Sequence, residues 1–268
     1  MSAATASHAV SSSTALPLDQ QVVLVTGAGR GLGASLARAF LSAGARVVIN
    51  YRHSAAGAEA VAAGAPDRAL AVQADVCDAA AVNAMFDAAA RHFGASVTTV
   101  INNALPDFSF NGDDRPDADS LTWEHLEQQF RGVNQGALNV IQAALAGMRE
   151  QGFGRVVNVG TNLFQNPIVP YHDYTAGKAA LLSLTRTFAH DLGPDNITVN
   201  MISGGLLRTT DASAATPDEV FDLIAANTPL RRVVTPDEFA DAALLFASPW
   251  SRAVTGQNLV VDGGLVKN

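Results

Sequence analysis

The 268-residue chain has few of the features that mark several large classes of protein. Its single cysteine, Cys77, cannot form an internal disulfide, so a reducing, cytoplasmic location is expected. No apolar run reaches the roughly 18 residues that a membrane-spanning helix needs. Lys and Arg number 17 against 25 Asp and Glu, and the resulting net charge of −8 excludes a surface built to bind nucleic acid. The histidines show no ligand spacing, so no metal site is expected.

The first 18 residues differ in composition from the rest of the chain. They are small and hydroxyl-rich, and they lack both the basic region and the apolar region of a secretory signal. We expect residues 1–18 to be a disordered tail, or the product of a misassigned start codon, in front of one domain that spans 19–268. With 48% apolar and 16% charged residues, the chain has the composition of a compact globular domain.

Short β-branched runs alternate with longer alanine-rich segments of helical period that end at glycine. The predicted strands are 22–26, 46–51, 70–74, 98–102, 155–159, 197–202 and 258–261, and the clearest helical segments are 32–44, 78–94 and 126–152. This alternation predicts an α/β fold, a single doubly wound Rossmann-type domain whose seven-stranded parallel sheet is flanked by helices on both faces.

Ligands of such sheets bind beyond the carboxyl ends of the strands. Two long, turn-rich segments follow strand ends, residues 105–120 and 204–222, and their length is typical of functional lids. Phe108 and Phe110 in the first segment could form a wall of the substrate pocket or pack locally.

A strand leads directly into the glycine-rich turn "TGAGRGLG", and a helical run follows it. Strand, tight turn and helix N-terminus together present backbone N–H groups to a pyrophosphate, so the turn predicts dinucleotide binding. The second strand ends in "NYRHS", without the acidic residue that would bind a ribose 2′-hydroxyl. Arg30 and Arg52 are instead suited to a 2′-phosphate, which favours NADP over NAD.

Polar residues after the third and fourth strands complete the predicted nucleotide site. Asp75 could accept a hydrogen bond from the adenine amino group or cap the next helix. Asn102 and Asn103 could brace the backbone or contact the adenosine ribose.

The motifs "TGAGRGLG", "INNA", "GVNQGALNV", "YTAGK" and "VDGG" occur in the order and spacing of the short-chain dehydrogenase/reductase family. The chain resembles this family from about Leu18 to Gly264, and is most similar to its 3-oxoacyl-[acyl-carrier-protein] reductase branch. The resemblance implies a homotetramer with carbonyl reductase activity, and the two arginines favour NADPH as its reductant. The implied catalytic residues are Asn134, Thr161, Tyr174 and Lys178. The implied cofactor contacts are Gly27, Gly29, Arg30, Gly31, Leu32, Gly33, Arg52, Asp75, Val76, Asn103, Ala104, Tyr174, Lys178, Leu207 and Thr209.

The residues support these roles independently. Tyr174 and Lys178 are four apart and share a helix face, where an ammonium would favour the phenolate and lower the phenol pKa. Tyr174 would donate a proton to the carbonyl oxygen. The resemblance assigns Asn134 to a water that links Lys178 to solvent. Thr161 stands where the family has serine, and it can donate to the developing oxyanion if its hydroxyl points inward.

Tyr171 offers a second phenol. Its spacing from Lys178 resembles that of enoyl reductases in the same family, which reduce a carbon–carbon double bond. Because Pro170 precedes it, Tyr171 is predicted to enter the helix and to line the pocket.

Three functions therefore stay open: a carbonyl reductase, an enoyl reductase, and a nucleotide-binding regulator without turnover. We expect the substrate to be a 3-oxoacyl thioester or a free small molecule, and docking of an acidic acyl carrier protein would require a basic patch. The candidates for such a patch are Arg131, Arg149, Arg155, Arg231 and Arg232.

Overall fold

A parallel seven-stranded sheet forms the centre of the molecule in a computed structural model, which describes residues 15–105, 108, 110, 115–210, 213–214 and 216–267. The strand order is β3-β2-β1-β4-β5-β6-β7. The strands are β1 (Val22–Val25), β2 (Arg46–Tyr51), β3 (Ala69–Gln73), β4 (Thr99–Asn102), β5 (Gly154–Thr161), β6 (Ile197–Gly204) and β7 (Asn258–Val261). All seven predicted strands are confirmed, and β5 and β6 extend two residues further toward the site than expected.

The strand order reverses beside β1. Val23 of β1 is in register with Val47 of β2 on one side and with Thr99 of β4 on the other. The chain therefore runs outward from β1 in both directions, and the connections diverge above the carboxyl ends of β1 and β4. A crevice of this kind is where open α/β sheets bind their ligands.

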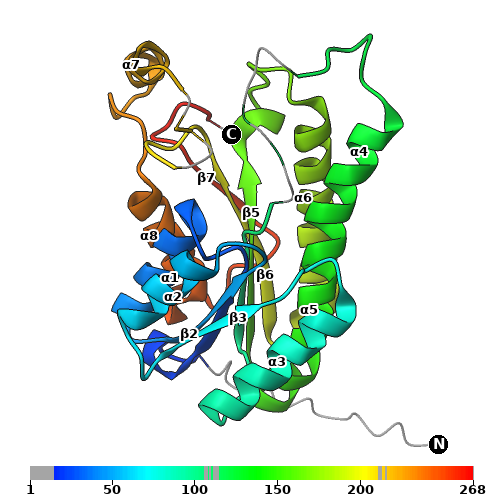
Figure 1. The fold of residues 1–268 in the computed structure, drawn as a ribbon, viewed down its shortest axis with the longest axis vertical. Helices are drawn as coiled ribbons and strands as arrows, with labels where there is room; N and C mark the ends of the chain where they lie inside the picture. The colour runs from blue at the N-terminus through cyan, green and yellow to red at the C-terminus, as the bar shows by residue number, and fades with distance from the viewer. Residues whose placement is uncertain are drawn as a thin grey trace, which may run out of the picture.

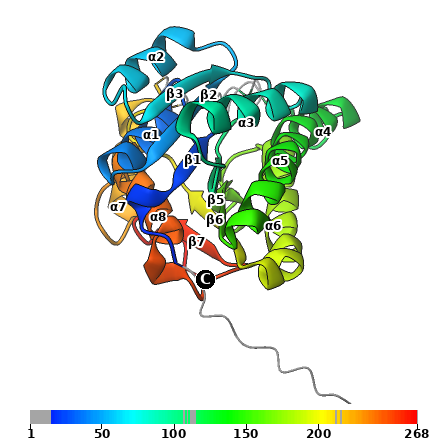
Figure 2. The ribbon, with the colours of Figure 1, turned by 90° about the horizontal axis from the view of Figure 1, so that it is seen from below.

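Helices cover both faces of the sheet (Figures 1 and 2). One face carries α1 (Gly31–Ser42), α2 (Ala55–Ala63) and α8 (Pro236–Ala247), and the other carries α3 (Ala79–Phe93), α5 (Gly136–Gln151) and α6 (His172–Leu192). The shorter α4 (Trp123–Gln129) packs on α6, and α7 (Asp218–Asn227) lies near the carboxyl ends of the strands. No helix of the described residues is long and apolar enough to cross a bilayer.

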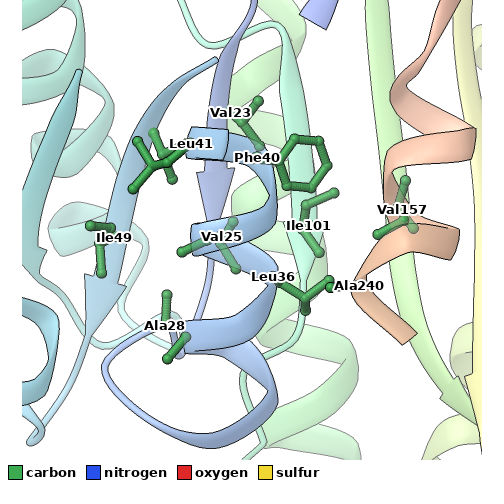
Figure 3. Close-up of a cluster of buried hydrophobic side chains, with 14 of the residues drawn as sticks. Val23, Val25, Ala28, Leu36, Phe40, Leu41, Ile49, Ile101, Val157 and Ala240 are labelled. Atoms are coloured by element: carbon green, nitrogen blue, oxygen red, sulfur yellow. The ribbon is translucent and has the colours of Figure 1, made fainter. Parts of the chain in front are cut away.

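Each face has its own hydrophobic core. Leu36 and Phe40 of α1 pack against Val25 and neighbouring strands on one face, as Figure 3 shows. Met85 and Met148 are buried on the other face. Burial of each such side chain contributes about 1.5–3 kcal/mol. The two cores therefore hold the helices against the two faces of the sheet.

Local signals end the helices as expected. The Asp78 side chain accepts hydrogen bonds from the backbone N–H groups of Ala80 and Ala81 at the start of α3. Gly94 and Gly152, with φ of 64° and 60°, end α3 and α5 in the left-handed conformation. Because Asp78 is the N-cap, the alternative that assigned this cap to Asp75 is wrong.

The predicted continuous helix over 126–152 is interrupted. A π-helical segment, Phe130–Gln135, separates α4 from α5 and contains Asn134. One extra residue in a turn barely changes the spacing of apolar residues, so periodicity cannot reveal it. Such π segments are frequent at functional sites.

The two long segments lie partly outside the described residues. In the first, 106, 107, 109 and 111–114 are not described, and in the second 211, 212 and 215 are not. The predicted tail lies outside the described residues up to residue 14. Beyond that point, the Gln21 side chain donates to the carbonyl of Leu16.

Candidate active site

The glycine-rich turn between β1 and α1 is built by close backbone approach. Gly27 and Gly31 have φ of 64° and 51°, a backbone conformation that residues with a side chain rarely adopt. A Cβ on Gly33 would lie 2.2 Å from the carbonyl oxygen of Gly27. Helix α1 starts at Gly31, so its first N–H groups, which lack partners within the helix, lie at this turn. The turn therefore fits a dinucleotide pyrophosphate.

Two asparagines brace the turn from neighbouring strands. The Asn103 side chain donates to the carbonyl of Thr26 at 2.9 Å. The Asn50 side chain accepts from the N–H of Gly27 at 3.2 Å and donates to the carbonyl of Ala74 at 3.0 Å. Of the two roles expected for Asn103, the structure shows the one in which its side chain braces the backbone. Asn50 was missed, although a buried amide in the apolar run "VVINY" was a usable signal.

The turn also packs against the start of α2. A Cβ on Gly29 would lie 2.6 Å from the carbonyl oxygen of Ser54, and one on Gly57 would lie 1.9 Å from that of Gly29. Only glycine fits at both positions. Arg52, which directly follows β2, is thereby held beside the turn that carries Arg30.

Arg30 and Arg52 differ in their surroundings. Arg30 is exposed at the N-cap of α1. Arg52 lies with its Nε 3.6 Å from a carboxylate oxygen of Asp75, and both side chains are nearly half exposed. The other carboxylate oxygen of Asp75 accepts from the N–H of Cys77 at 2.9 Å. Asp75 therefore orients Arg52 and stabilises the turn after β3.

The remaining predicted cofactor residues occupy different settings. Ala104 donates its N–H to the Thr26 hydroxyl at 2.9 Å. Val76 is buried, and a Cβ on Gly136 would lie 2.8 Å from its side chain. Leu207 is buried after β6, whereas Thr209 is exposed. Leu32 is half-buried in the first turn of α1.

The four predicted catalytic residues come from three elements that meet at the carboxyl end of β5. Thr161 is the last residue of β5, Tyr174 and Lys178 lie on α6, and Asn134 lies in the π segment. The hydroxyl of Thr161 accepts from the N–H of Leu163 at 3.3 Å, and it also lies near enough to the phenol of Tyr174 to favour the phenolate. The threonine hydroxyl therefore faces the tyrosine, as it must to act as a donor to an oxyanion.

Burial controls the ionisation of both Tyr174 and Lys178. It raises the pKa of Tyr174 to about 12, and the hydrogen bond with Thr161 opposes that change. It lowers the pKa of Lys178 to about 8. The expectation that the ammonium would lower the phenol pKa is wrong for the protein alone. Lys178 donates instead to the carbonyl of Val159 at 2.7 Å, and its Nζ lies 5.9 Å from the Tyr174 ring centroid.

Asn134 joins the π segment to α6. Its side-chain N–H donates to the carbonyl of Gly177 at 3.1 Å. Its side-chain oxygen is buried, and within the described residues it accepts no hydrogen bond. A buried acceptor of this kind is suited to an ordered water.

Asn162 is a structural contributor that sequence reasoning missed. It donates to a carboxylate oxygen of Asp262 at 2.9 Å, and the other oxygen of Asp262 accepts from the N–H of Gly264 at 3.0 Å. A Cβ on Gly205 would lie 2.8 Å from the Asn162 amide nitrogen. The "VDGG" motif therefore ties the C-terminal segment to the residue beside Thr161, a link that the motif alone could have suggested.

Two aromatic residues from the first long segment reach the site. Phe108 and Phe110 have ring centroids 4.9 and 5.4 Å from that of Tyr174. Tyr171 is the N-cap of α6, with its centroid 6.5 Å from that of Tyr174. The predicted helix-entry position of Tyr171 is confirmed. His172, the first residue of α6, is exposed.

The fold and these residues define a Rossmann-type oxidoreductase, and comparison with known proteins agrees. Residues 27–266 match a family model described as enoyl-(acyl carrier protein) reductase. Versicolorin reductase 1 of Aspergillus parasiticus is 34% identical, over 92% of this chain and 97% of its own length. A probable galactose dehydrogenase of Rhizobium meliloti is 33% identical, over 91% of this chain and 94% of its own length. The structure of a Serratia marcescens short-chain dehydrogenase/reductase double mutant superimposes with a TM-score of 0.81 at 31% identity. The match covers 93% of this chain and 99% of the mutant chain.

The chain belongs to the short-chain dehydrogenase/reductase family and is a short-chain oxidoreductase. The family binds a nicotinamide cofactor, NAD or NADP. The relatives are named for different substrates, so the resemblance to the 3-oxoacyl-carrier-protein reductase branch receives no specific support.

Proposed function

We propose that the protein is an NADPH-dependent carbonyl reductase in which Tyr174 protonates the carbonyl oxygen. The observation that carries this proposal is the buried phenol of Tyr174, which lies near the hydroxyl of Thr161 and one helical turn from Lys178. With a pKa of about 12, the phenol is fully protonated at neutral pH and available as a general acid.

The glycine-rich turn and the braces around it would hold the dinucleotide, with Val76, Ala104, Leu207 and Thr209 among its contacts. When bound, NADPH supplies the hydride that reduces the carbonyl carbon. Arg30 and Arg52 would bind the 2′-phosphate, because no acidic residue ends β2 to repel it.

The chain's own groups divide the remaining work. Tyr174 donates its proton to the carbonyl oxygen, and the hydroxyl of Thr161 stabilises the charge that develops there. Lys178 holds the nicotinamide ribose and favours the phenolate left after proton transfer. The free side-chain oxygen of Asn134 binds the water that returns a proton from solvent.

The substrate we favour is a small-molecule ketone. Docking of an acidic carrier protein has little support, because Arg155 is fully buried and cannot belong to a basic surface patch. Arg149, Arg131 and Arg232 are paired with Asp195, Glu127 and Glu238. A 3-oxoacyl thioester stays a testable substrate. We further propose that the protein is a homotetramer in which α5 and α6 pack across a two-fold axis. We also propose that it is located in the cytoplasm.

An enoyl reductase is the second candidate, supported by the description of the matching family model and by the position of Tyr171. The deciding experiment measures NADPH and NADH oxidation with simple ketones, 3-oxoacyl thioesters and enoyl thioesters side by side. Turnover of ketones with NADPH supports the proposal, and turnover of enoyl thioesters alone overturns it. Tight NADPH binding without turnover of any substrate would indicate a regulator.

A further inference from the structure

Four aromatic rings meet at the entrance of α6. The rings of Phe108 and Tyr174 are tilted by only 32°, with centroids 4.9 Å apart, which is close to stacking. The other contacts are edge-on: Phe110 meets Tyr174 at 75° and Tyr171 at 77°, and Phe108 meets Tyr171 at 88°. The phenol that we assign to proton transfer is therefore surrounded by π faces and ring edges.

A buried ion pair anchors this cluster. Arg115 lies with a guanidinium nitrogen 2.5 Å from a carboxylate oxygen of Asp173, and its guanidinium carbon is 4.3 Å from the centroid of Phe108. The side chains of Asp173 and Arg115 are only 5% and 15% exposed. Asp173 immediately precedes Tyr174 on α6, so the catalytic helix itself holds Arg115, and Arg115 holds the ring of Phe108.

Nothing in the proposed chemistry requires this arrangement. Proton donation from Tyr174 needs Thr161 and Lys178, and neither Phe108 nor Arg115 contributes a group to it. A wall of stacked and edge-on rings does, however, discriminate between ligands. Aromatic pairs are favourable beyond the apolar area that they bury, and the gain depends on a flat ring with a π face. A puckered saturated ring buries as much apolar surface but lacks that face.

We propose that Phe108, Phe110 and Tyr171 form a ring-binding subsite that selects flat, fused aromatic ketones, and that the Arg115–Asp173 pair positions Phe108 within it. This inference rests on the proposed carbonyl reductase function. A substrate ring would pack against these three rings, with the ketone oxygen directed at the phenol of Tyr174. Arg115 and Asp173 are positioning residues, since they act through Phe108.

The test compares 2-tetralone with 2-decalone, two bicyclic ketones with the same carbon skeleton that differ in whether the second ring is aromatic. For the wild-type enzyme with NADPH, kcat/KM for 2-tetralone should exceed that for 2-decalone by about tenfold, the effect of one or two aromatic pairs. Phe108→Leu should lower this ratio by about five- to tenfold, mainly through a higher KM for 2-tetralone. Asp173→Asn should also lower this ratio, because the neutral amide cannot hold Arg115 as tightly as the carboxylate does.

Phe93→Leu is the matched control. Phe93 also carries an arginine over its ring, with the Arg46 guanidinium 6.0 Å from its centroid, but it ends α3 beside the first residue of β2, at the amino end of that strand. This variant should leave the ratio unchanged. Equal kcat/KM for the two ketones in the wild type, or a ratio that survives Phe108→Leu, would overturn the inference while leaving carbonyl reduction intact.

Binding separates the two proposals if neither ketone is turned over. In that case carbonyl reduction fails for these substrates, and calorimetric titration of the NADPH-loaded protein with 2-naphthol and 2-decalol still tests the subsite. Tighter binding of 2-naphthol that is lost in Phe108→Leu supports the subsite. Equal Kd values for the two alcohols contradict it.

Discussion

The hydroxyl of Thr161, at the carboxyl end of β5, lies near the phenol of Tyr174 in the first turn of α6 and opposes the rise in its pKa that burial causes. This contact joins the sheet to α6 at the place where we propose that the substrate carbonyl binds. The extra methyl of threonine therefore does not turn the hydroxyl away from the phenol.

Substitution of Thr161 tests this contact. Thr161→Ser keeps the donor and removes a methyl group, so kcat should be retained or rise. Thr161→Val keeps the shape but loses the donor, and kcat should fall about a hundredfold, as for removal of an oxyanion donor. Steady-state ketone reduction measures both variants, and equal rates for serine and valine would remove Thr161 from the mechanism.

Burial of Lys178 should reduce stability at neutral pH. The folded pKa of about 8, against an ordinary value of 10.5, means that the folded protein binds fewer protons than the unfolded chain between these values. The penalty is therefore fully present below about pH 8 and is lost as the pH rises toward 10.5. Lys178→Met should abolish activity yet raise the free energy of unfolding at pH 7 by about 2 kcal/mol.

Urea unfolding at pH 7 and pH 10 measures this difference. The stability gain of Lys178→Met should be largest at pH 7 and several-fold smaller at pH 10. A gain that does not depend on pH would show that packing, and not the buried charge, is responsible.

Arg30 and Arg52 should determine the cofactor preference. Combined replacement of both by alanine removes two cations from the place assigned to the 2′-phosphate. We expect kcat/KM for NADPH to fall by about 10- to 100-fold, with that for NADH changed less than threefold. Arg91→Ala, an exposed change near the end of α3, is the control. Parallel losses with both cofactors would contradict a 2′-phosphate site.

The close approach at the glycine-rich turn makes Gly33 intolerant of any side chain. Because a Cβ there would lie 2.2 Å from the carbonyl oxygen of Gly27, Gly33→Ala must open the turn. We expect NADPH binding, followed by fluorescence titration, to weaken at least tenfold and the free energy of unfolding to drop by about 1–3 kcal/mol. Gly193→Ala has no atom within 4 Å of the added Cβ and should change neither quantity.

Three features could be predicted because each depends on residues close together in the sequence. They are the strands, the glycine-rich turn and the helix face that Tyr174 shares with Lys178. Alternating β-branched runs specify buried strands, and a spacing of four specifies a helix face. The NADP preference, the catalytic roles and the homotetramer stay predictions. They depend on bound partners as well as on the chain.

Features that join distant segments and lie outside the motifs were not predictable. Arg115 and Asp173 are 58 residues apart, and neither belongs to a motif. The phenol pKa was predicted in the wrong direction, because the sequence shows that Lys178 is near but not that both groups are desolvated. Burial is a property of the packed molecule, and it outweighs one neighbouring charge here.

The central claim is that Tyr174, and not Tyr171, supplies the proton to a carbonyl oxygen. It is tested most directly by kcat for ketone-dependent NADPH oxidation in Tyr174→Phe and Tyr171→Phe. We predict a loss of at least about a hundredfold in Tyr174→Phe, with NADPH binding retained, and a change of less than about fivefold in Tyr171→Phe. A Tyr174→Phe enzyme that keeps its ketone turnover, or a larger loss in Tyr171→Phe, would contradict the account.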